Sequence, residues 1–108
     1  MARQRQPRYI NKRVTDEAQH HKCQSCGADD DTVVAAHSNQ GRHGKSMARK
    51  AHDCFVAYLC ASCHSWLDQG GASKQLKDEV WDVAHKKSIP LFRHLLDEDG
   101  VRLLEDQA

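Results

Sequence analysis

The chain has 108 residues, of which 39% are hydrophobic and 29% charged, so we expect one domain whose thin core needs a further staple such as a metal. No apolar run approaches the roughly 20 residues that span a bilayer, and no apolar stretch follows the N-terminus. We therefore expect neither a membrane helix nor a secretory signal, but a reducing cytoplasm. In that compartment the five cysteines are expected to be metal ligands rather than disulfide partners.

Charge is distributed unevenly along the chain, although the net charge is only +1. Residues 1–14 contain five basic residues and no acid, and residues 40–53 contain four basic residues and one acid. From Asp68 onward there are nine acids and six basic residues, so this part is net negative. The asymmetry favours one face for a polyanion, and the alternative is a solvated tail with a solvated loop.

In chain order, the sequence predicts a basic, flexible N-terminal arm over residues 1–14 and one domain over residues 15–108. One or two helical turns are expected at residues 15–21, followed by a compact cysteine knuckle. A strand rich in β-branched residues is predicted at residues 32–37. The polar segment 38–53 is long for a connection in so small a domain, which is typical of a functional or a disordered loop.

The second half is predicted to contain one strand and three helical pieces, at residues 55–59, 62–70, 74–87 and 91–96 in that order. Ser73 is expected to cap the longest helix and Pro90 to break the chain after it, with an acidic tail at the end. The predicted fold class is therefore α+β. Its strand–strand–helix core is expected at about residues 23–71, and a C-terminal helical extension at residues 72–108.

Two cysteine pairs with the same spacing give the strongest signal. Cys23 and Cys26 are separated by two residues, as are Cys60 and Cys63, and this spacing lets both thiolates of a pair bind one ion. Two such pairs complete the tetrahedral site of a structural zinc ion. Neither pair begins a helix in a βαβ unit, so a thioredoxin-like redox motif is not expected. Cys54 is expected to be a packed strand residue.

Histidine and aspartate residues near these pairs indicate a second, chemical site. His37 ends the first predicted strand, whereas His64 follows the last cysteine and Asp68 lies one helical turn further on. Because positions i and i+4 share a helix face, His64 and Asp68 can bind one divalent ion. A neutral histidine such as His37 suits the activation of water. The simpler alternatives are a surface histidine, a spare zinc ligand and a local salt bridge.

The order of these elements resembles zinc-containing HNH nucleases. The segments AAHSN at residues 35–39 and LCASCHSWLD at residues 59–68 are similar to those of the small YbcO-like nucleases encoded by prophages. The resemblance implies a zinc-stapled ββα-metal (HNH, His-Me finger) domain with a C-terminal helix, and a metal-dependent endonuclease that hydrolyses DNA phosphodiester bonds. It also implies His37 as general base, and His64 and Asp68 as ligands of a catalytic Mg²⁺, Mn²⁺ or Zn²⁺ ion. Phage or prophage DNA processing in a bacterial host cell is implied as the setting.

Two positions depart from the HNH pattern. Many HNH nucleases carry an acid or histidine ligand directly before the base, where this chain has Ala36. The catalytic metal is then expected to have two side-chain ligands, completed by water and phosphate. The second strand also offers no asparagine to orient His37. Asp53 and the nearby Asn39 are the two candidates for this supporting role.

The loop between the strands is expected to bind DNA. Four of its side chains are basic and suit phosphate contacts that carry no sequence preference: Arg42, Lys45, Arg49 and Lys50. A recombination or replication protein is a further candidate partner, and the oligomeric state is left open.

Two other functions are compatible with the sequence. The first is a non-catalytic zinc module that binds DNA or a protein partner, which the alanine at position 36 keeps open. The second is a structural adaptor that dimerises through the helical face of Leu76, Val80 and Trp81, provided that this face is exposed.

Overall fold

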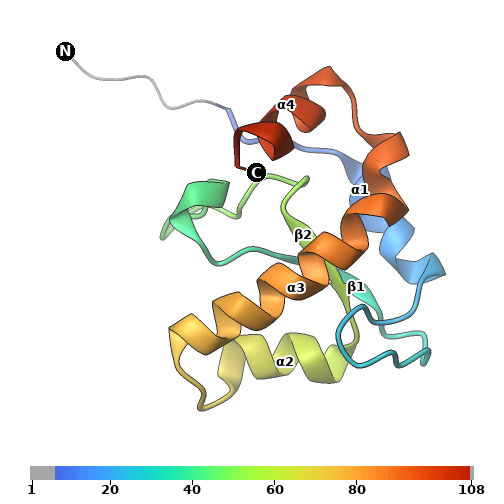
Figure 1. Cartoon of the computed structure of the whole chain (residues 1–108), viewed down its shortest axis with the longest axis vertical. Helices are drawn as coiled ribbons and strands as arrows, with labels where there is room; N and C mark the ends of the chain where they lie inside the picture. The colour runs from blue at the N-terminus through green and yellow to red at the C-terminus, as the bar shows by residue number, and fades with distance from the viewer. Residues whose placement is uncertain (1–6, 108) are drawn as a thin grey trace.

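Two short antiparallel strands lie at the centre of the molecule (Figure 1). The structure is a computed structural model that describes residues 7–107. Strand β1 (Val34–His37) pairs with β2 (Val56–Leu59) in a register that places His37 opposite Val56. Every residue of β2 is buried, whereas β1 has one exposed residue, Val34, and two partly exposed ones, Ala35 and His37.

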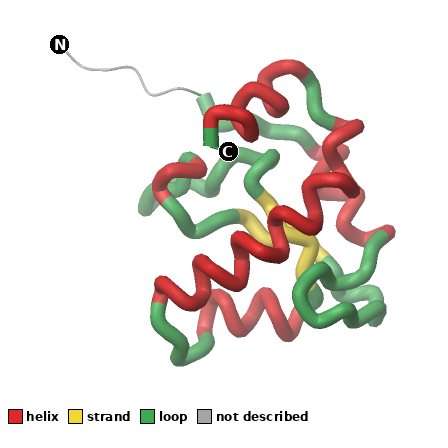
Figure 2. Tube along the Cα trace, in the orientation of Figure 1, coloured by secondary structure: helices red, strands yellow, loops and turns green. Residues whose placement is uncertain are grey.

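Helices enclose this hairpin on several sides, as Figure 2 shows. In the described part of the chain they are α1 (Lys12–Glu17), α2 (Ala61–Gln69), α3 (Lys74–Phe92) and α4 (Glu98–Asp106), with 3₁₀ turns at Ala18–His20, Gly41–His43 and Arg93–Leu95. The two strands, α2 and the start of α3 agree with the prediction to within about two residues. None of the described helices has the length and apolar character needed to cross a membrane.

Helix α3 takes the place of a third strand along the edge of β2. The backbone N–H of Tyr58 donates to Ser88 Oγ (3.0 Å), and the Val56 carbonyl oxygen lies 2.8 Å from His85 Nδ1. A strand edge buried without such partners would leave polar backbone groups unsatisfied. These α3 side chains therefore fix the helix against the hairpin while its apolar residues join the core.

One prediction about the C-terminal part is wrong. Pro90 does not break the chain, because α3 continues through it to Phe92. A proline removes one helical N–H, but Pro90 lies in the last turn, and the fully buried Phe92 offsets that loss. The acidic tail forms α4, within the predicted C-terminal helical extension, since Asp97 caps its start by accepting from Gly100 N (3.1 Å) and Leu104 is buried.

The described part of the N-terminal arm, residues 7–14, is docked on the domain and differs from the predicted flexible segment. Tyr9 N donates to His52 Nδ1 (2.9 Å), and the Tyr9 carbonyl accepts from Asp53 N (3.0 Å). Asn11 then caps α1, which begins three residues earlier than predicted, and Val14 is fully buried. Long-range hydrogen bonds thus order a segment that has no periodic pattern of its own.

A histidine buried in the core makes the fold sensitive to acid. His43 is 3% exposed, its ring stacks on Phe55 with centroids 4.3 Å apart, and its Nδ1 lies 2.6 Å from Ser38 Oγ. Burial, helped by the charge of Arg42, lowers the pKa of His43 to about 4. The unfolded chain takes up this proton nearer pH 6.5, so stability is complete above that pH and is lost as the pH falls toward 4.

We expect His43 to reduce the free energy of unfolding by about 3 kcal/mol between pH 6.5 and pH 4, and His43→Phe to remove this share. Urea unfolding of wild type and variant at several pH values measures this contribution as the difference between their free energies of unfolding. Acid effects on the cysteines are common to both proteins and cancel in the difference. The same substitution at the exposed His94 is the control. Equal pH dependence of wild type and His43→Phe would exclude His43 as the acid-sensitive group.

Candidate metal centre and active site

Four cysteine thiols gather where the loop before β1 meets the start of α2. Cys23 and Cys26 belong to that loop, Cys60 is the N-cap of α2, and Cys63 lies in its first turn. The Sγ atoms all lie within 4.8 Å of one another, and those of Cys26 and Cys60 are 3.6 Å apart. Tetrahedral zinc with Zn–S bonds of about 2.3 Å needs sulfur atoms about 3.8 Å apart. The predicted cluster is therefore present and fits a structural zinc ion.

The backbone holds the first cysteine pair in this shape. Cys23 N donates to the Ala28 carbonyl (2.8 Å), and Gly27 N donates to the Cys23 carbonyl (3.0 Å). Gly27 has a φ of 81°, a left-handed conformation that glycine adopts without steric cost. Gln24 N donates to the Tyr58 carbonyl (2.8 Å), which joins the knuckle directly to β2.

The thiols of the cluster differ in how readily they ionise. Burial raises the pKa of Cys23, but backbone N–H groups of Cys26, Cys60 and Ser25 lower it overall to about 6. Burial and the neighbouring thiols raise the pKa of Cys63 to about 12. A divalent metal bound within the cluster would supply positive charge that favours the thiolate form of its ligands.

A second group of side chains lines an open hollow of about 470 Å³, bounded by β1, the loop that follows it and α2. It includes the predicted base, His37, and both predicted ligands of a catalytic metal, His64 and Asp68. His64 Nε2 lies 3.5 Å from Asp68 Oδ2, and both of these side chains are exposed in part. The fold therefore brings the three candidate residues to one place.

The His64–Asp68 pair supplies two side-chain ligands. Within residues 7–107, the cysteine cluster is the one group of three or more His, Cys, Asp or Glu side chains close enough to share an ion. Ala36, where HNH nucleases often have a further ligand, is 1% exposed and belongs to the core. An ion held by His64 and Asp68 would keep several water ligands, as Mg²⁺ commonly does.

A buried carboxylate holds the ring of His37. Asp53 Oδ1 lies 2.8 Å from His37 Nε2 and also accepts from Arg8 Nη2, while Oδ2 accepts from Asn11 N (2.7 Å). Burial raises the pKa of Asp53, but the bonds from His37 and Asn11 and the charge of Arg8 lower it overall, so the carboxylate is ionised. Of the two side chains predicted to support His37, Asp53 is in contact with it and Asn39 is exposed.

The contact with Asp53 favours a proton on Nε2 of His37. An ionised carboxylate can only accept hydrogen bonds, so the proton of the neutral ring is assigned to Nε2. Arg8 Nη2 lies 3.2 Å from the same nitrogen, but as a donor it forms its hydrogen bond with Asp53 Oδ1. No residue in the described range forms a hydrogen bond with Nδ1, and its lone pair is free to accept a proton from water. A histidine supported in this way by a buried carboxylate is suited to act as a general base.

Arg8 is the residue of this site that sequence reasoning missed. Its Nε donates to the Ala51 carbonyl (3.1 Å), and its Nη2 forms an ion pair with Asp53, which lies 45 positions away. It is one of five basic residues in residues 1–14, and no local pattern distinguishes it from the others. Two of those others, Arg3 and Arg5, lie outside the described residues.

Two of the four basic side chains in the loop after β1 lie at the hollow. Lys45 and Lys50, two of the four basic residues predicted to contact phosphate, line the hollow. Arg42 lies instead 3.3 Å from both carboxylate oxygens of Asp82 on α3. The backbone of Arg49 pairs with that of Ser46 in a tight turn, with hydrogen bonds of 3.0 and 3.3 Å.

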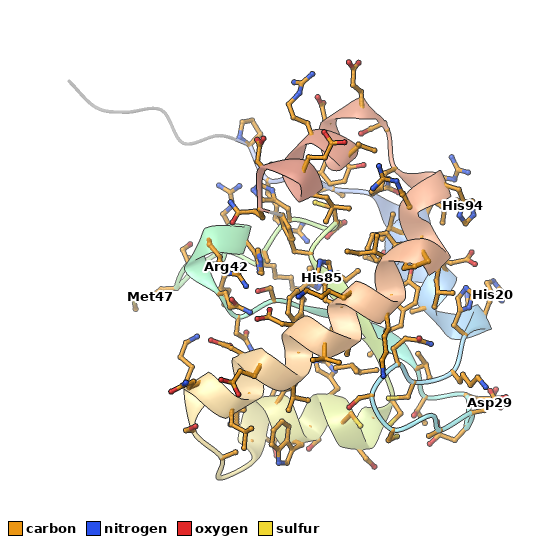
Figure 3. All side chains as sticks on the ribbon, in the orientation of Figure 1. His20, Asp29, Arg42, Met47, His85 and His94 are labelled. Atoms are coloured by element: carbon orange, nitrogen blue, oxygen red, sulfur yellow. The ribbon has the colours of Figure 1, made fainter. Side chains whose placement is uncertain are left out.

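The base of this loop is anchored to the core. His52 N donates to the His43 carbonyl (3.1 Å), and Gly44 between them has a φ of 94°. A Cβ atom at Gly44 would lie 2.8 Å from the ring of His52, so the loop requires glycine at this point. The tip of the loop, Met47, points away from the body of the molecule (Figure 3).

A family model described as "Protein of unknown function (DUF968)" matches residues 1–98. The matched range contains both cysteine pairs, both strands and every residue that lines the hollow. No curated protein and no solved structure matches the chain.

If the four cysteines hold one structural zinc ion, Cys60→Ser is expected to lose the metal and unfold the domain, because metal binding supplies much of the folding free energy of such small units. Elemental analysis measures bound zinc, and far-ultraviolet circular dichroism measures folding. Cys54→Ser is the matched control, since Cys54 is fully buried but lies outside the cluster, and it should keep the zinc. Folded wild-type protein without bound metal would contradict the assignment.

Proposed function

We propose that the chain, which belongs to the DUF968 family, is a metal-dependent endonuclease that hydrolyses DNA phosphodiester bonds, with His37 as general base. One observation carries the proposal. A single hollow contains a histidine held by a buried carboxylate, a His–Asp pair suited to a divalent ion, and two lysines. The resemblance of residues 35–39 and 59–68 to HNH nucleases supports the same chemistry.

Hydrolysis of a phosphodiester needs a base for the attacking water. In the proposed reaction, His37 Nδ1 accepts a proton from water while the water oxygen bonds to phosphorus and the bond from phosphorus to the leaving oxygen breaks. The hydrogen bond from Nε2 to Asp53 stabilises the imidazolium that forms. Arg8 and the Asn11 backbone keep Asp53 ionised and in place, so we assign Arg8 a positioning role.

Charge compensation is the second requirement of the reaction. A divalent ion such as Mg²⁺, Mn²⁺ or Zn²⁺, when bound, neutralises charge on the phosphate and on the leaving oxygen. His64 and Asp68 are the residues that would hold it. Cys63 directly precedes His64, so the cysteine cluster fixes the turn of α2 from which both ligands project. Lys45 and Lys50 add positive charge at the same hollow.

A non-catalytic zinc module that binds DNA or a protein partner is the second candidate function. It is favoured by the absence, among residues 7–107, of a third side-chain ligand beside His64 and Asp68. An i,i+4 pair of this kind also occurs as an ordinary surface salt bridge. Cleavage assays distinguish the two candidates, because only the nuclease converts bound DNA to product.

For the chemistry, we expect His37→Ala to reduce cleavage by about 100-fold or more while zinc content, fold and DNA binding are unchanged. His64→Ala and Asp68→Ala should instead weaken binding of the second metal, so that excess Mn²⁺ partly restores cleavage. The difference arises because mass action compensates for a lost ligand but not for a lost base. Plasmid nicking with Mg²⁺, Mn²⁺ or a chelator measures these effects.

His20→Ala, at an exposed histidine outside the hollow, is the control for this series. Full cleavage by His37→Ala would exclude His37 as the base. Wild-type protein that binds DNA but cleaves it with none of these metals would favour the zinc module.

For the basic loop, we expect the double variant Lys45→Ala, Lys50→Ala to bind all DNA sequences more weakly and to lower the slope of log affinity against log salt by about 1 to 2. The reason is that a protein with fewer phosphate contacts releases fewer counterions from DNA when it binds. Fluorescence anisotropy across a salt series measures the slope. The double variant Lys22→Ala, Lys86→Ala removes the same charge from exposed positions outside the hollow, and an equal effect there would exclude a specific role for the loop.

A further inference from the structure

The outer face of α3 carries an apolar stripe that the proposed nuclease does not use. Leu76 is 46% exposed and Val83 is 56% exposed, and Val80 lies between them, partly buried. Spacings of four and three residues place these three side chains on one face of the helix. Trp81, which the sequence groups with this face, is 3% exposed and belongs to the core. The exposed stripe is therefore aliphatic and faces solvent.

The same surface is also recessed. A hollow of about 290 Å³ lies between the stripe and the cysteine knuckle at Gln24 and Ser25. Past Ser25 and Val80 it adjoins a second, more apolar hollow of about 380 Å³, whose lining includes Trp66. The face thus presents projecting aliphatic side chains beside recesses that such side chains can fill. An interface between identical surfaces needs both features on one patch.

Two opposite charges flank Val83 symmetrically. Glu79 lies four residues before Val83 and Lys87 lies four residues after it, and both line the first hollow. At a rise of 1.5 Å per residue, the two are about 12 Å apart along the helix axis. With 100° of rotation per residue, they lie about 40° to either side of Val83. If the direction of the helix is reversed with Val83 as the centre, Glu79 and Lys87 therefore exchange positions.

We propose that this α3 face binds the same face of a second copy of the chain, with the two α3 helices antiparallel and Val83 at the twofold axis. Glu79 then meets Lys87 of the partner subunit, and Lys87 meets Glu79 of the partner subunit. Val83 packs against Val83 of the partner subunit across the axis, and Leu76 of each copy fills a recess of the other. A parallel arrangement would place like charges together, which the antiparallel one avoids.

This association goes beyond the proposed nuclease and does not depend on it. The α3 stripe, Glu79, Lys87 and the knuckle residues share no member with the lining of the His37 hollow. The His37 hollow of each copy therefore lies outside the interface, and the self-association can be measured without any cleavage assay.

Sedimentation velocity of the full zinc-loaded chain over about 1–100 µM tests the proposal. We expect a concentration-dependent dimer, which Val83→Lys converts to monomer. Glu79→Lys and Lys87→Glu should each raise the dimer dissociation constant by about tenfold, because each creates two like-charge contacts across the axis. The double variant Glu79→Lys, Lys87→Glu should return the constant to near the wild-type value, since it restores both opposite-charge pairs.

Val34→Lys is the matched control, because Val34 is a valine of similar exposure, 44%, in β1. It lines the His37 hollow and neither of the hollows beside α3. The substitution should leave the dimer intact. A wild-type chain that is monomeric throughout this concentration range would overturn the proposal. The α3 face would then be uncovered or would bind a different protein. The proposal would also be overturned if none of the three single α3 substitutions changed the dimer dissociation constant. The same holds if the double variant did not return that constant to near the wild-type value. Circular dichroism and zinc content show that each variant is folded.

Discussion

The junction between the two cysteine pairs is the constraint on which the other features of the structure depend. It joins the loop before β1 to the end of β2 and the start of α2, across the 34 positions from Cys26 to Cys60. With 39% hydrophobic residues in 108, the core contributes limited stability, so a cluster that closes so long a loop has a large effect on the fold. The enclosed segment carries β1, the basic loop and β2, and thus His37 and Asp53.

The position of His37 depends on both ends of the described chain. Asp53, which holds the His37 ring, accepts from Asn11 N, and Asn11 Nδ2 in turn donates to the Leu95 carbonyl (3.0 Å). Helix α4 also approaches this segment, so closely that a Cβ at Gly100 would lie 2.7 Å from the Tyr9 hydroxyl oxygen. Helix α4 therefore supports the candidate base indirectly, by clamping the N-terminal segment against the loop.

Two faces of the domain have separate characters. The face formed by β1, its loop and α2 is polar and basic and contains the candidate catalytic residues, whereas the outer face of α3 is aliphatic. Because α3 satisfies the edge of β2 with Ser88 and His85 on its inner side, its outer side is free for another role. The proposed dimer would relate the His37 hollows of its two copies by a twofold axis. That is also the symmetry used by dimeric proteins that bind duplex DNA, so the two proposals are compatible.

The sequence by itself determined the features that depend on short spacings and local patterns: the cysteine cluster, the two strands, α2 with its His64–Asp68 pair, and the Ser73 cap. Only the tertiary structure decided the features that depend on burial and on residues far apart in the chain. It selected Asp53 rather than Asn39 to hold His37, and it brought Arg8 to that carboxylate. It also carried α3 past Pro90. The physical reason is that such groups are fixed by partners 16 to 45 positions away, or by packing, which no local periodicity records.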